Sequence, residues 1–484
     1  MVSLPTVTKL LIGGAWCANH SERTFPSINP ADGSVLAEIA EASEKDVDRA
    51  VAAARTALDP WWRMGPSERG RRLLVLAELV EQHSAEIAHL ETLDCGKPIS
   101  ESSRSDVPKA IECLMFFSGA ADKIYGDAIP INGALMGMVL REPYGVVAQI
   151  VPWNFPILLA VWKLAPALAA GNTIVLKPSL ETSLSALRLG ELIIQADFPP
   201  GTVNIVTGPG ETTGRALVGH PDVDKIAFTG STAVGQEIIR SSAQAITPLS
   251  LELGGKGANI VFADADLEAA VNGAVKGAFA NQGQICFSGS RLFLQDAIYR
   301  EFVERLIERT LAIRQGNPMD ASVSMGPQVS QAHWRRILDY IEIGKNEGAM
   351  LVCGGGRPPD QKLAKGFYIQ PTVFANVDNS MRIAQEEIFG PVLSVISFKD
   401  EADAVSQANN TRYGLSAGIW TRDITRAHRV AQKVRAGTAW VNCFNKTHPA
   451  IPFGGHKMSG YGRDNGMECA FSYTQTKSVW INLE

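Results

Sequence analysis

The sequence lacks the features that mark several common classes of protein. No run of lysine and arginine stands out, and 45 basic residues are outnumbered by 50 acidic ones. The chain therefore has no electrostatic footprint for nucleic acid or an anionic membrane surface, and we expect neither as a partner. The most apolar segment, residues 155–176, is interrupted by Lys163 and by prolines, so it indicates a buried helix and strand rather than a membrane span.

Cysteine is scarce and scattered. The seven cysteines are odd in number and never form a Cys-x-x-Cys pair. They indicate neither a disulfide framework nor a zinc site, so we expect no metal and a reducing compartment. Residues 1–16 lack the charged region, long apolar core and cleavage site of a secretory signal. We therefore expect a cytoplasmic protein.

What the sequence does contain is an alternation of short strands and helices. Runs rich in β-branched residues lie at 146–151, 173–177, 203–206 and 225–228, separated by helical stretches such as 184–196. This pattern predicts an α/β fold with a parallel, doubly wound sheet covered on both faces. Such sheets bind ligands in the crevice beyond the carboxyl ends of their strands. The 484 residues are too many for one core and predict two or three domains.

The same alternation starts again in the second half of the chain. Strand patterns at residues 259–262, 390–398 and 438–442 predict a second doubly wound α/β domain. The β-branched segment 473–483 follows no helix of its own, and residues 123–141 are a candidate partner for it. A terminal strand of this kind is expected to have its edge covered by another subunit.

Three turns between a strand and a helix are rich in glycine and hydroxyl residues. They lie at residues 177–179, 208–210 and 229–235. In the last of them, Gly230 and Ser231 open a helix whose free N–H groups suit a pyrophosphate. Alone the pattern is weak, because a Ser helix cap beside a packing glycine looks the same.

Cys286 is the thiol with the most polar surroundings. An isolated cysteine in an apolar setting is usually an inert small hydrophobe. Cys286, however, lies between glycines and amides in residues 283–289, which indicates a tight loop after a helix. Amide dipoles in such a loop can stabilise a thiolate, so Cys286 is a candidate nucleophile.

Two further residues have side chains that suit work on a carbonyl group. Glu252 interrupts an apolar run that ends in Gly254 and Gly255, and burial there raises a carboxyl pKa towards the range of a general base. The alternative is a strand-end Glu that points to solvent. Asn154 is held between Pro152 and Pro156, so its amide is either a rigid oxyanion donor or a helix cap.

Together these segments resemble the aldehyde dehydrogenase family. Seven motifs occur in that family's order across the chain, at residues 152–156, 177–179, 228–231, 251–256, 283–286, 386–391 and 452–455. The resemblance implies a dinucleotide-binding domain, a catalytic domain, an oligomerisation arm, and a homodimer or homotetramer. Its expected boundaries are 1–122 with 142–253, then 254–456, and 123–141 with 470–484.

The resemblance also implies roles for single residues. Cys286 is expected to be the nucleophile, Glu252 the general base, and Asn154 with the Cys286 N–H the oxyanion hole, for the oxidation of an aldehyde to its acid with NAD(P)+. Lys177 is expected at the adenosine ribose, Ser231 at the pyrophosphate, and Glu387 with Phe389 at the nicotinamide. The full set expected to hold the cofactor is Trp153, Lys177, Ser179, Gly210, Gly230, Ser231, Glu387 and Phe389.

One departure bears on the choice of cofactor. NAD-preferring relatives often have a Glu three positions after the lysine of residue 177, and this chain has Leu180 there. A carboxylate at this point holds the ribose hydroxyls and repels a 2′-phosphate. Its loss predicts tolerance of NADP+, with Lys177 and Ser179 able to hold the phosphate.

The resemblance implies a mostly apolar substrate tunnel, suited to an uncharged aliphatic or aromatic aldehyde. No arginine is expected there to bind a carboxylate, which argues against an acidic semialdehyde. The residues expected to line the tunnel are Phe155, Leu159, Trp162, Ile285, Phe287, Thr447 and Phe453.

Three other functions remain open at this point. A CoA-acylating dehydrogenase needs no Glu base, so Glu252 argues against it. A cofactor-independent thiol hydrolase leaves the glycine-rich turns without a use and lacks a histidine placed to pair with Cys286. A non-catalytic, structural use of the fold does not need Cys286, Glu252 and Asn154 together.

Overall fold

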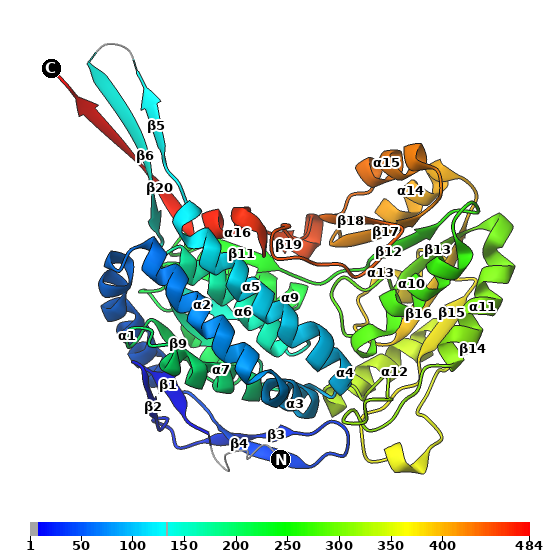
Figure 1. Cartoon of the computed structure of the whole chain (residues 1–484). Coiled ribbons are helices and arrows are strands. Elements are labelled where there is room, and N and C mark those ends of the chain that lie inside the picture. Colours follow the sequence, from blue (N-terminus) through cyan, green and yellow to red (C-terminus); the bar gives the residue numbers. More distant parts are fainter. Residues whose placement is uncertain (1–7, 132–133) are drawn as a thin grey trace.

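The computed structural model describes residues 8–131 and 134–484, which form two α/β bodies and a projecting β arm (Figure 1). The first body is built on an eight-stranded sheet with the order β19-β11-β10-β7-β8-β9-β1-β2. Its strands are β1 (Leu10–Ile12), β2 (Ala15–Cys17), β7 (Val146–Ile150), β8 (Thr173–Lys177), β9 (Val203–Ile205), β10 (Lys225–Thr229), β11 (Leu249–Glu252) and β19 (Gly460–Tyr461). The five central strands are parallel, as expected.

Helices cover both faces of this sheet, and the side chains of its strands alternate between two cores. Val146 and Val175 pack in the cluster that includes α1, while Val147 and Ile174 pack in the larger cluster that includes α6. The helices of this body are α1 (Glu44–Arg63), α2 (Pro66–Gln82), α3 (Ser84–Cys95), α4 (Ile99–Glu101), α5 (Val107–Ala120), α6 (Pro156–Ala169), α7 (Leu184–Gln195), α8 (Arg215–Val218), α9 (Thr232–Ser242) and α16 (Gly466–Ser472).

The second body has a seven-stranded sheet with the order β14-β15-β16-β13-β12-β17-β18. Its strands are β12 (Ala258–Val261), β13 (Arg291–Gln295), β14 (Met350–Cys353), β15 (Thr372–Ala375), β16 (Val392–Phe398), β17 (Ser416–Trp420) and β18 (Thr438–Val441). Its helices are α10 (Leu267–Phe279), α11 (Tyr299–Leu311), α12 (Gln331–Asn346), α13 (Arg382–Gln385), α14 (Glu401–Asn409) and α15 (Ile424–Lys433). All of its strand pairs except β14–β15 are parallel, so the predicted fold class is confirmed.

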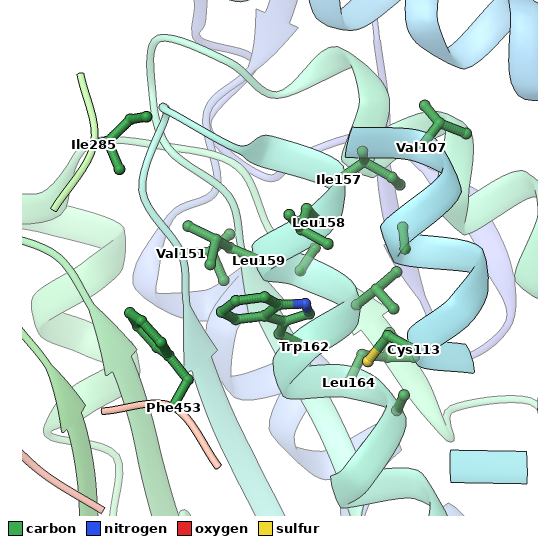
Figure 2. Packing of buried hydrophobic residues seen from close by; sticks show 14 of the residues in the cluster. Val107, Cys113, Val151, Ile157, Leu158, Leu159, Trp162, Leu164, Ile285 and Phe453 are labelled. Atoms are coloured by element: carbon green, nitrogen blue, oxygen red, sulfur yellow. The ribbon is translucent and has the colours of Figure 1, made fainter. Parts of the chain in front are cut away.

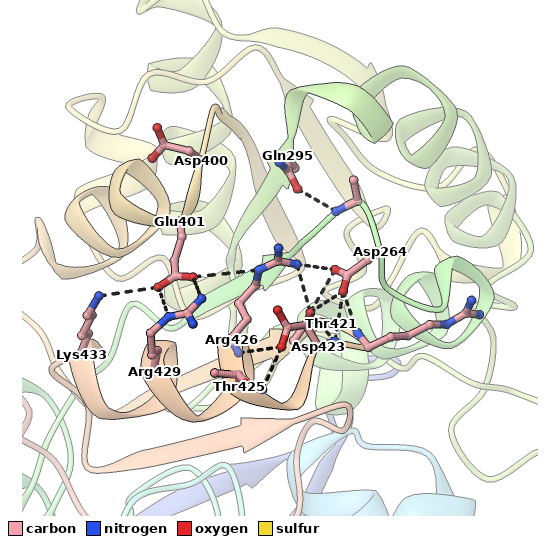
Figure 3. A network of polar contacts seen from close by, with 12 residues as sticks. Asp264, Gln295, Asp400, Glu401, Thr421, Asp423, Thr425, Arg426, Arg429 and Lys433 are labelled. Carbon is pink, nitrogen blue, oxygen red and sulfur yellow. Dashed lines mark hydrogen bonds and ion pairs between the residues drawn. The ribbon is translucent and has the colours of Figure 1, made fainter.

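An ion-pair network closes the carboxyl edge of the second sheet (Figure 3). Asp264, just after β12, accepts hydrogen bonds from the Thr421 hydroxyl and from Arg426 Nη1, both at 2.8 Å. Glu401 at the start of α14 pairs with Arg429 and Lys433 of α15. These side chains occupy the edge where doubly wound sheets commonly bind ligands. The second sheet presents its opposite edge to the site described below.

The chain's last strand builds the arm. β20 (Thr474–Asn482) pairs antiparallel with β6 (Leu135–Pro143), which also pairs with β5 (Asp127–Pro130). The three strands extend away from both bodies, and the C-terminus lies at the tip (Figure 1). The predicted pairing of the two arm segments is confirmed, whereas the domain boundaries given above stay a prediction. A short hairpin of β3 (Thr24–Ile28) and β4 (Val35–Ala40) completes the fold.

Candidate active site

The main cavity lies where the two sheets face one another and has a volume of about 350 Å³. The carboxyl edge of the first sheet supplies the segments after β7, β10 and β11, since these parallel strands end side by side. The amino edge of the second sheet supplies the loops before β13 and β16. The residues that carry its chemistry are Trp153, Asn154, Glu181, Gly230, Ser231, Gly254, Cys286, His333, Arg336, Glu387 and Phe389.

A second, narrower cavity meets the first at Cys286, which lines both. Its walls come from α5, α6 and the loops around Phe287 and Phe453. The Trp162 and Phe453 rings lie 5.7 Å apart across it, and Figure 2 shows them facing one another beside α6. The complete lining is Lys109, Phe155, Leu158, Leu159, Trp162, Thr229, Glu252, Leu253, Cys286, Phe287, Thr447, Phe453 and Asp464.

Cys286 is presented by a loop with an unusual backbone. Asn281, Gln282 and Gly283 adopt left-handed conformations in succession, with φ of 47°, 55° and 74°. A Cβ on Gly283 would lie 2.3 Å from the carbonyl carbon of Gly390, so the loop packs directly on the Phe-Gly-Pro segment. The Glu101 carboxylate accepts the Asn281 N–H at 3.0 Å. These contacts fix the thiol where the two cavities meet.

The surroundings of Cys286 act on the pKa of its thiol. Burial raises its pKa, and the carboxyls of Glu387 and Glu252 raise it further. Hydrogen bonding by the backbone N–H groups of Cys286 and Phe287 acts in the opposite direction but is outweighed. The expected stabilisation of a thiolate by amide dipoles thus acts against burial here, and it stays a prediction.

Asn154 is held rigidly beside Cys286. Its backbone carbonyl accepts hydrogen bonds from Lys97 Nζ and Asn281 Nδ2, both at 2.8 Å. Its own side-chain amide donates to the Gln284 carbonyl at 2.9 Å, which leaves the second amide hydrogen available. Since Lys97 is paired with the buried Asp106, the positions of both partners are fixed. Asn154 is thus held in a fixed position, and its role as an oxyanion donor stays a prediction.

Glu252 ends β11 with its carboxyl group buried in the narrow cavity. Neither carboxyl oxygen has a hydrogen-bond partner among the described residues. A Cβ on Gly454 would lie 2.5 Å from Oε1, so only glycine leaves room for this carboxyl group. Burial raises the pKa of Glu252, the nearby Asp464 raises it further, and Lys163 and Arg463 oppose the rise. The alternative of a solvent-exposed Glu is wrong, because 5% of the residue is exposed.

Glu387 approaches the site from the other sheet. Its Oε1 accepts the Gly255 N–H at 2.9 Å, and a Cβ on Gly254 would collide with its Oε2. Gly254 therefore lets Glu387 come close, whereas a Cβ on Gly255 would lie 2.3 Å from the Cys286 carbonyl oxygen. Burial raises the pKa of Glu387 to about 7. The Phe389 ring meets the Trp153 indole edge-on at 5.2 Å and forms a wall of the main cavity.

The turn after β10 has the geometry of an anion site. Ser231 is the N-cap of α9, where its hydroxyl accepts the Val234 N–H at 3.3 Å. The first N–H groups of an α-helix have no partner within the helix and carry its positive dipole end. Both Gly230 and Ser231 line the main cavity. These residues fit the pyrophosphate of a dinucleotide.

Three of the expected cofactor residues stand apart from the cavity lining: Lys177, Ser179 and Gly210. Lys177 ends β8 with 4% of its surface exposed, and its Nζ donates to the Pro178 carbonyl at 3.1 Å. Burial lowers the pKa of Lys177 to about 8, although Glu181 and Glu211 favour its charged form. Ser179 donates its hydroxyl to the Glu181 carboxylate. Lys177, Ser179 and Gly210 are therefore not among the residues that line the main cavity.

Residues 16–479 match the family described as the aldehyde dehydrogenase family. Human mitochondrial aldehyde dehydrogenase is 46% identical over 98% of this chain and 92% of its own. The crystal structure of PnpE from Pseudomonas sp. WBC-3, solved also with nicotinamide adenine dinucleotide, is 48% identical with a TM-score of 0.97 over 99% and 98% of the two chains. An NAD+ complex of aldehyde dehydrogenase from Bacillus cereus is 44% identical, with the same TM-score and coverage.

The chain belongs to the aldehyde dehydrogenase family. The resemblance carried by the seven motifs is confirmed, and so is the expected class of enzyme, an oxidoreductase that oxidises aldehydes with NAD(P)+. Among the described residues no helix is long and apolar enough to cross a membrane. Likewise, that part of the chain holds no group of three His, Cys, Asp or Glu side chains arranged for a metal ion.

Of the seven residues expected to line the dehydrogenase's substrate tunnel, six line the narrow cavity. Ile285 does not, although its side chain belongs to the same buried core as Leu159 and Trp162 (Figure 2). Sequence reasoning also missed several residues that do line the cavities. Lys109 and Asp464 lie in the narrow cavity, and Glu181 and His333 in the main one.

For Lys109, His333 and Glu181, the sequence itself explains why they were missed. Lys109 lies at helical spacing between the buried residues Asp106 and Cys113. A lysine on the buried side of a predicted helix could therefore have been recognised from the sequence. His333 had no such signal, because its contact with the Phe389 carbonyl at 2.7 Å spans 56 residues. Glu181 was missed because it stands one position after the place where NAD-preferring relatives often have a Glu.

Proposed function

We propose that Cys286 is the nucleophile of this aldehyde dehydrogenase, with Asn154 as oxyanion donor and Glu252 as general base. The observation that carries the proposal is the cavity arrangement. Cys286 stands where the two cavities meet, the rigid Asn154 amide lines the main cavity, and the buried Glu252 lines the narrow one. Covalent catalysis of this kind divides a difficult oxidation into two easier steps.

In the first step the Cys286 sulfur attacks the aldehyde carbon and the thiol loses its proton. Its raised pKa means that a base must take this proton, and Glu252 and Glu387 are the carboxyl groups that act on the thiol. The new oxyanion accepts hydrogen bonds from Asn154 Nδ2 and the Cys286 N–H, a contribution of about 3–4 kcal/mol for such a donor. Bound NAD(P)+ supplies the acceptor for the aldehyde hydrogen as hydride.

The residues that hold the cofactor follow from the cavity. Trp153, Gly230 and Ser231 fit its phosphate end, and Glu387 with Phe389 fits the end nearest Cys286. The Arg336 guanidinium donates to the Glu387 carbonyl at 2.8 Å and steadies that segment. What remains on the enzyme after the oxidation is a Cys286 thioester.

Glu252 then releases the acid. Its carboxylate takes a proton from water, the hydroxyl adds to the thioester carbon, and Cys286 leaves as the thiol. This role separates the proposal from a CoA-acylating enzyme, in which a thiol substrate replaces water. A buried, unpartnered carboxyl beside the nucleophile supports hydrolysis.

The proposal is tested by NAD+ reduction with hexanal as substrate. Cys286→Ala is expected to abolish reduction, while Cys353→Ala, which removes another partly buried free thiol, leaves it unchanged. Activity retained in Cys286→Ala overturns the assignment. A thiol hydrolase would instead cleave a nitrophenyl ester through Cys286 and reduce no NAD+.

We further propose that this dehydrogenase prefers NAD+ over NADP+. Leu180 removes the family's carboxylate, but the Glu181 carboxylate lines the main cavity and accepts the Ser179 hydroxyl. With Glu211 it also faces the buried Lys177. Two carboxylates here repel a 2′-phosphate, an effect that the expectation drawn from Leu180 left out. Tolerance of NADP+ itself stays a prediction.

Glu181→Gln tests this preference. Removing the charge is expected to lower the KM for NADP+ by roughly tenfold while that for NAD+ changes little. Leu180→Gln is the matched control at the neighbouring position. An unchanged ratio of kcat/KM for the two cofactors in Glu181→Gln contradicts the proposal.

We also propose a homodimer or homotetramer assembled through the arm, in a reducing compartment such as the cytoplasm. β20 has an open edge, and Trp480 and Leu483 on this arm are each 66% exposed. Exposed apolar side chains beside an open edge are features of a subunit interface. All seven cysteines are free, which supports the choice of compartment.

A further inference from the structure

One wall of the narrow cavity is not apolar. Lys109 of α5 lines it together with Phe155, Trp162 and Phe453. In the described part of the chain it is the single cation among the lining residues. Neither of the two carboxyl groups that line the cavity forms an ion pair with Lys109. Glu252 has a raised pKa, and Asp464 is paired with Lys163 at 3.1 Å.

Lys109 has no counter-ion of its own. It is half-buried, and no hydrogen bond or salt bridge joins it to another described residue. Of its two acidic neighbours, Asp106 is occupied by Lys97 and Glu112 is exposed on the outer side of the helix.

The electrostatic surroundings of Lys109 are unfavourable for a cation. Burial is the largest effect and lowers its pKa; Asp106 and Glu112 oppose this, while the exposed lysines Lys276 and Lys446 lower the pKa further. An unpaired, partly desolvated cation with cations nearby gains free energy when an anion binds. A residue placed in a cavity in this way is a candidate for recognising a ligand.

We infer that the physiological aldehyde carries a carboxylate at the end opposite its carbonyl group, and that Lys109 binds this carboxylate. The inference rests on the proposed function, since it assumes that the aldehyde reaches Cys286 through the narrow cavity. The rings of Phe155, Trp162 and Phe453 contact an apolar body between the two ends. The expectation of an uncharged substrate considered arginine alone and overlooked Lys109.

The lining favours a carboxylate over a phosphate. Thr229 and Thr447 are the hydroxyl donors that line the cavity with Lys109; Thr229 also lines the main cavity, which leaves Thr447 as the hydroxyl of the narrow cavity alone, and no arginine is among the described lining residues. A phosphate dianion needs several donors to replace its water, whereas a single ammonium group with one hydroxyl suits a carboxylate.

The test compares acidic semialdehydes with the uncharged aldehydes of equal chain length: succinic, glutaric and adipic semialdehyde against butanal, pentanal and hexanal. For the best-fitting pair we expect a preference of roughly 10- to 100-fold in kcat/KM for the acid, the range of a hydrogen bond to a charged group. The preference should lie mainly in KM and weaken with added salt.

Lys109→Met removes the charge and keeps the length and apolar stem of the side chain. We expect it to abolish the preference and its salt dependence. Lys109→Arg is expected to keep most of the preference. The melting temperature of Lys109→Met should not fall, because the variant removes a desolvated cation.

A wild-type enzyme without the preference, or an unchanged preference in Lys109→Met, overturns the inference. Both results leave the proposed function standing, since hexanal is still oxidised through Cys286. Failure of the proposed function looks different: Cys286→Ala then still oxidises hexanal and the semialdehydes alike.

Discussion

At the scale of single residues, the proposed chemistry uses carboxyl groups that the fold keeps out of water. Glu252 and Glu387 both have raised pKa values, and both act on the Cys286 thiol. A buried carboxyl with a raised pKa is a useful proton acceptor near neutral pH, whereas an exposed one is a weak base there. The glycines at 254 and 454 make these burials possible.

The pH dependence of turnover should report Glu252. Since the base form exists only above its raised pKa, thioester hydrolysis is expected to increase with pH through that value, which lies well above 4.5. Arg463 lowers this pKa, so Arg463→Gln should move the midpoint to higher pH. Single-turnover hydrolysis measured across pH checks this, and a midpoint that moves down contradicts it.

The same group affects stability. A carboxyl whose pKa is raised by folding contributes stability fully below its unfolded value of 4.5 and loses it as pH rises through the folded pKa. The melting temperature of the wild type should therefore fall, relative to Glu252→Gln, as pH rises from 4.5. Parallel melting curves for the two proteins at every pH would contradict the assignment of a buried Glu252.

Cys286, Glu252 and Asn154 could be found from the sequence because each stands in a short motif with its own glycines or prolines. Lys109 stands in no such motif and shows only as a cation at helical spacing between buried residues, and His333 gives no signal because its contact with the Phe389 carbonyl joins segments 56 residues apart. The Cys286 pKa shows a different limit. Its loop predicts amide dipoles, but only the folded structure shows that burial outweighs them.

At the scale of elements, strand order explains the site. β7, β10 and β11 are neighbours in the sheet although about 80 residues separate the first two, so Asn154, Ser231 and Glu252 meet at one edge. Parallel alternation in the sequence predicts such an edge. It does not predict that the second sheet turns its amino edge to the same cavity, since that depends on how the two bodies pack against each other.

Gly283 tests whether the Cys286 loop needs its close packing. At Gly283, φ is +74°, and an added Cβ would lie 2.3 Å from Gly390. Gly283→Ala is expected to lower kcat at least tenfold and reduce stability by more than the about 1–2 kcal/mol of a strained backbone. Gly348→Ala is the control, since φ is +88° there with open space around the Cβ. Equal loss of stability in both variants contradicts this account of the loop.

At the scale of the whole molecule, the contacts within one chain explain the stability of the arm least well. β5, β6 and β20 form a three-stranded sheet that extends from the body, with exposed Leu135, Met136 and Trp480. The sequence predicted its two segments, because a terminal strand without a helix needs a partner. The number of subunits depends on surface complementarity, which the strand pattern does not encode.

Trp480→Glu tests the assembly. Placing a charge on the arm is expected to dissociate the oligomer, as measured by light scattering after gel filtration, with an unchanged circular dichroism spectrum. Ile424→Glu, on α15, is the control because Ile424 is 68% exposed and lies far from the arm in sequence and space (Figure 1). Dissociation by Ile424→Glu and not by Trp480→Glu would place the interface elsewhere.

The central claim is that the aldehyde is oxidised on Cys286 and released by Glu252, and trapping the intermediate tests it most directly. Glu252→Gln is mixed with NAD+ and hexanal, quenched with acid within one turnover, digested, and analysed by mass spectrometry. The account predicts a burst of NADH matching the enzyme concentration, slow turnover afterwards, and a hexanoyl group on the peptide that contains Cys286. A burst without acylation of that peptide, or full steady-state turnover by Glu252→Gln, would contradict it.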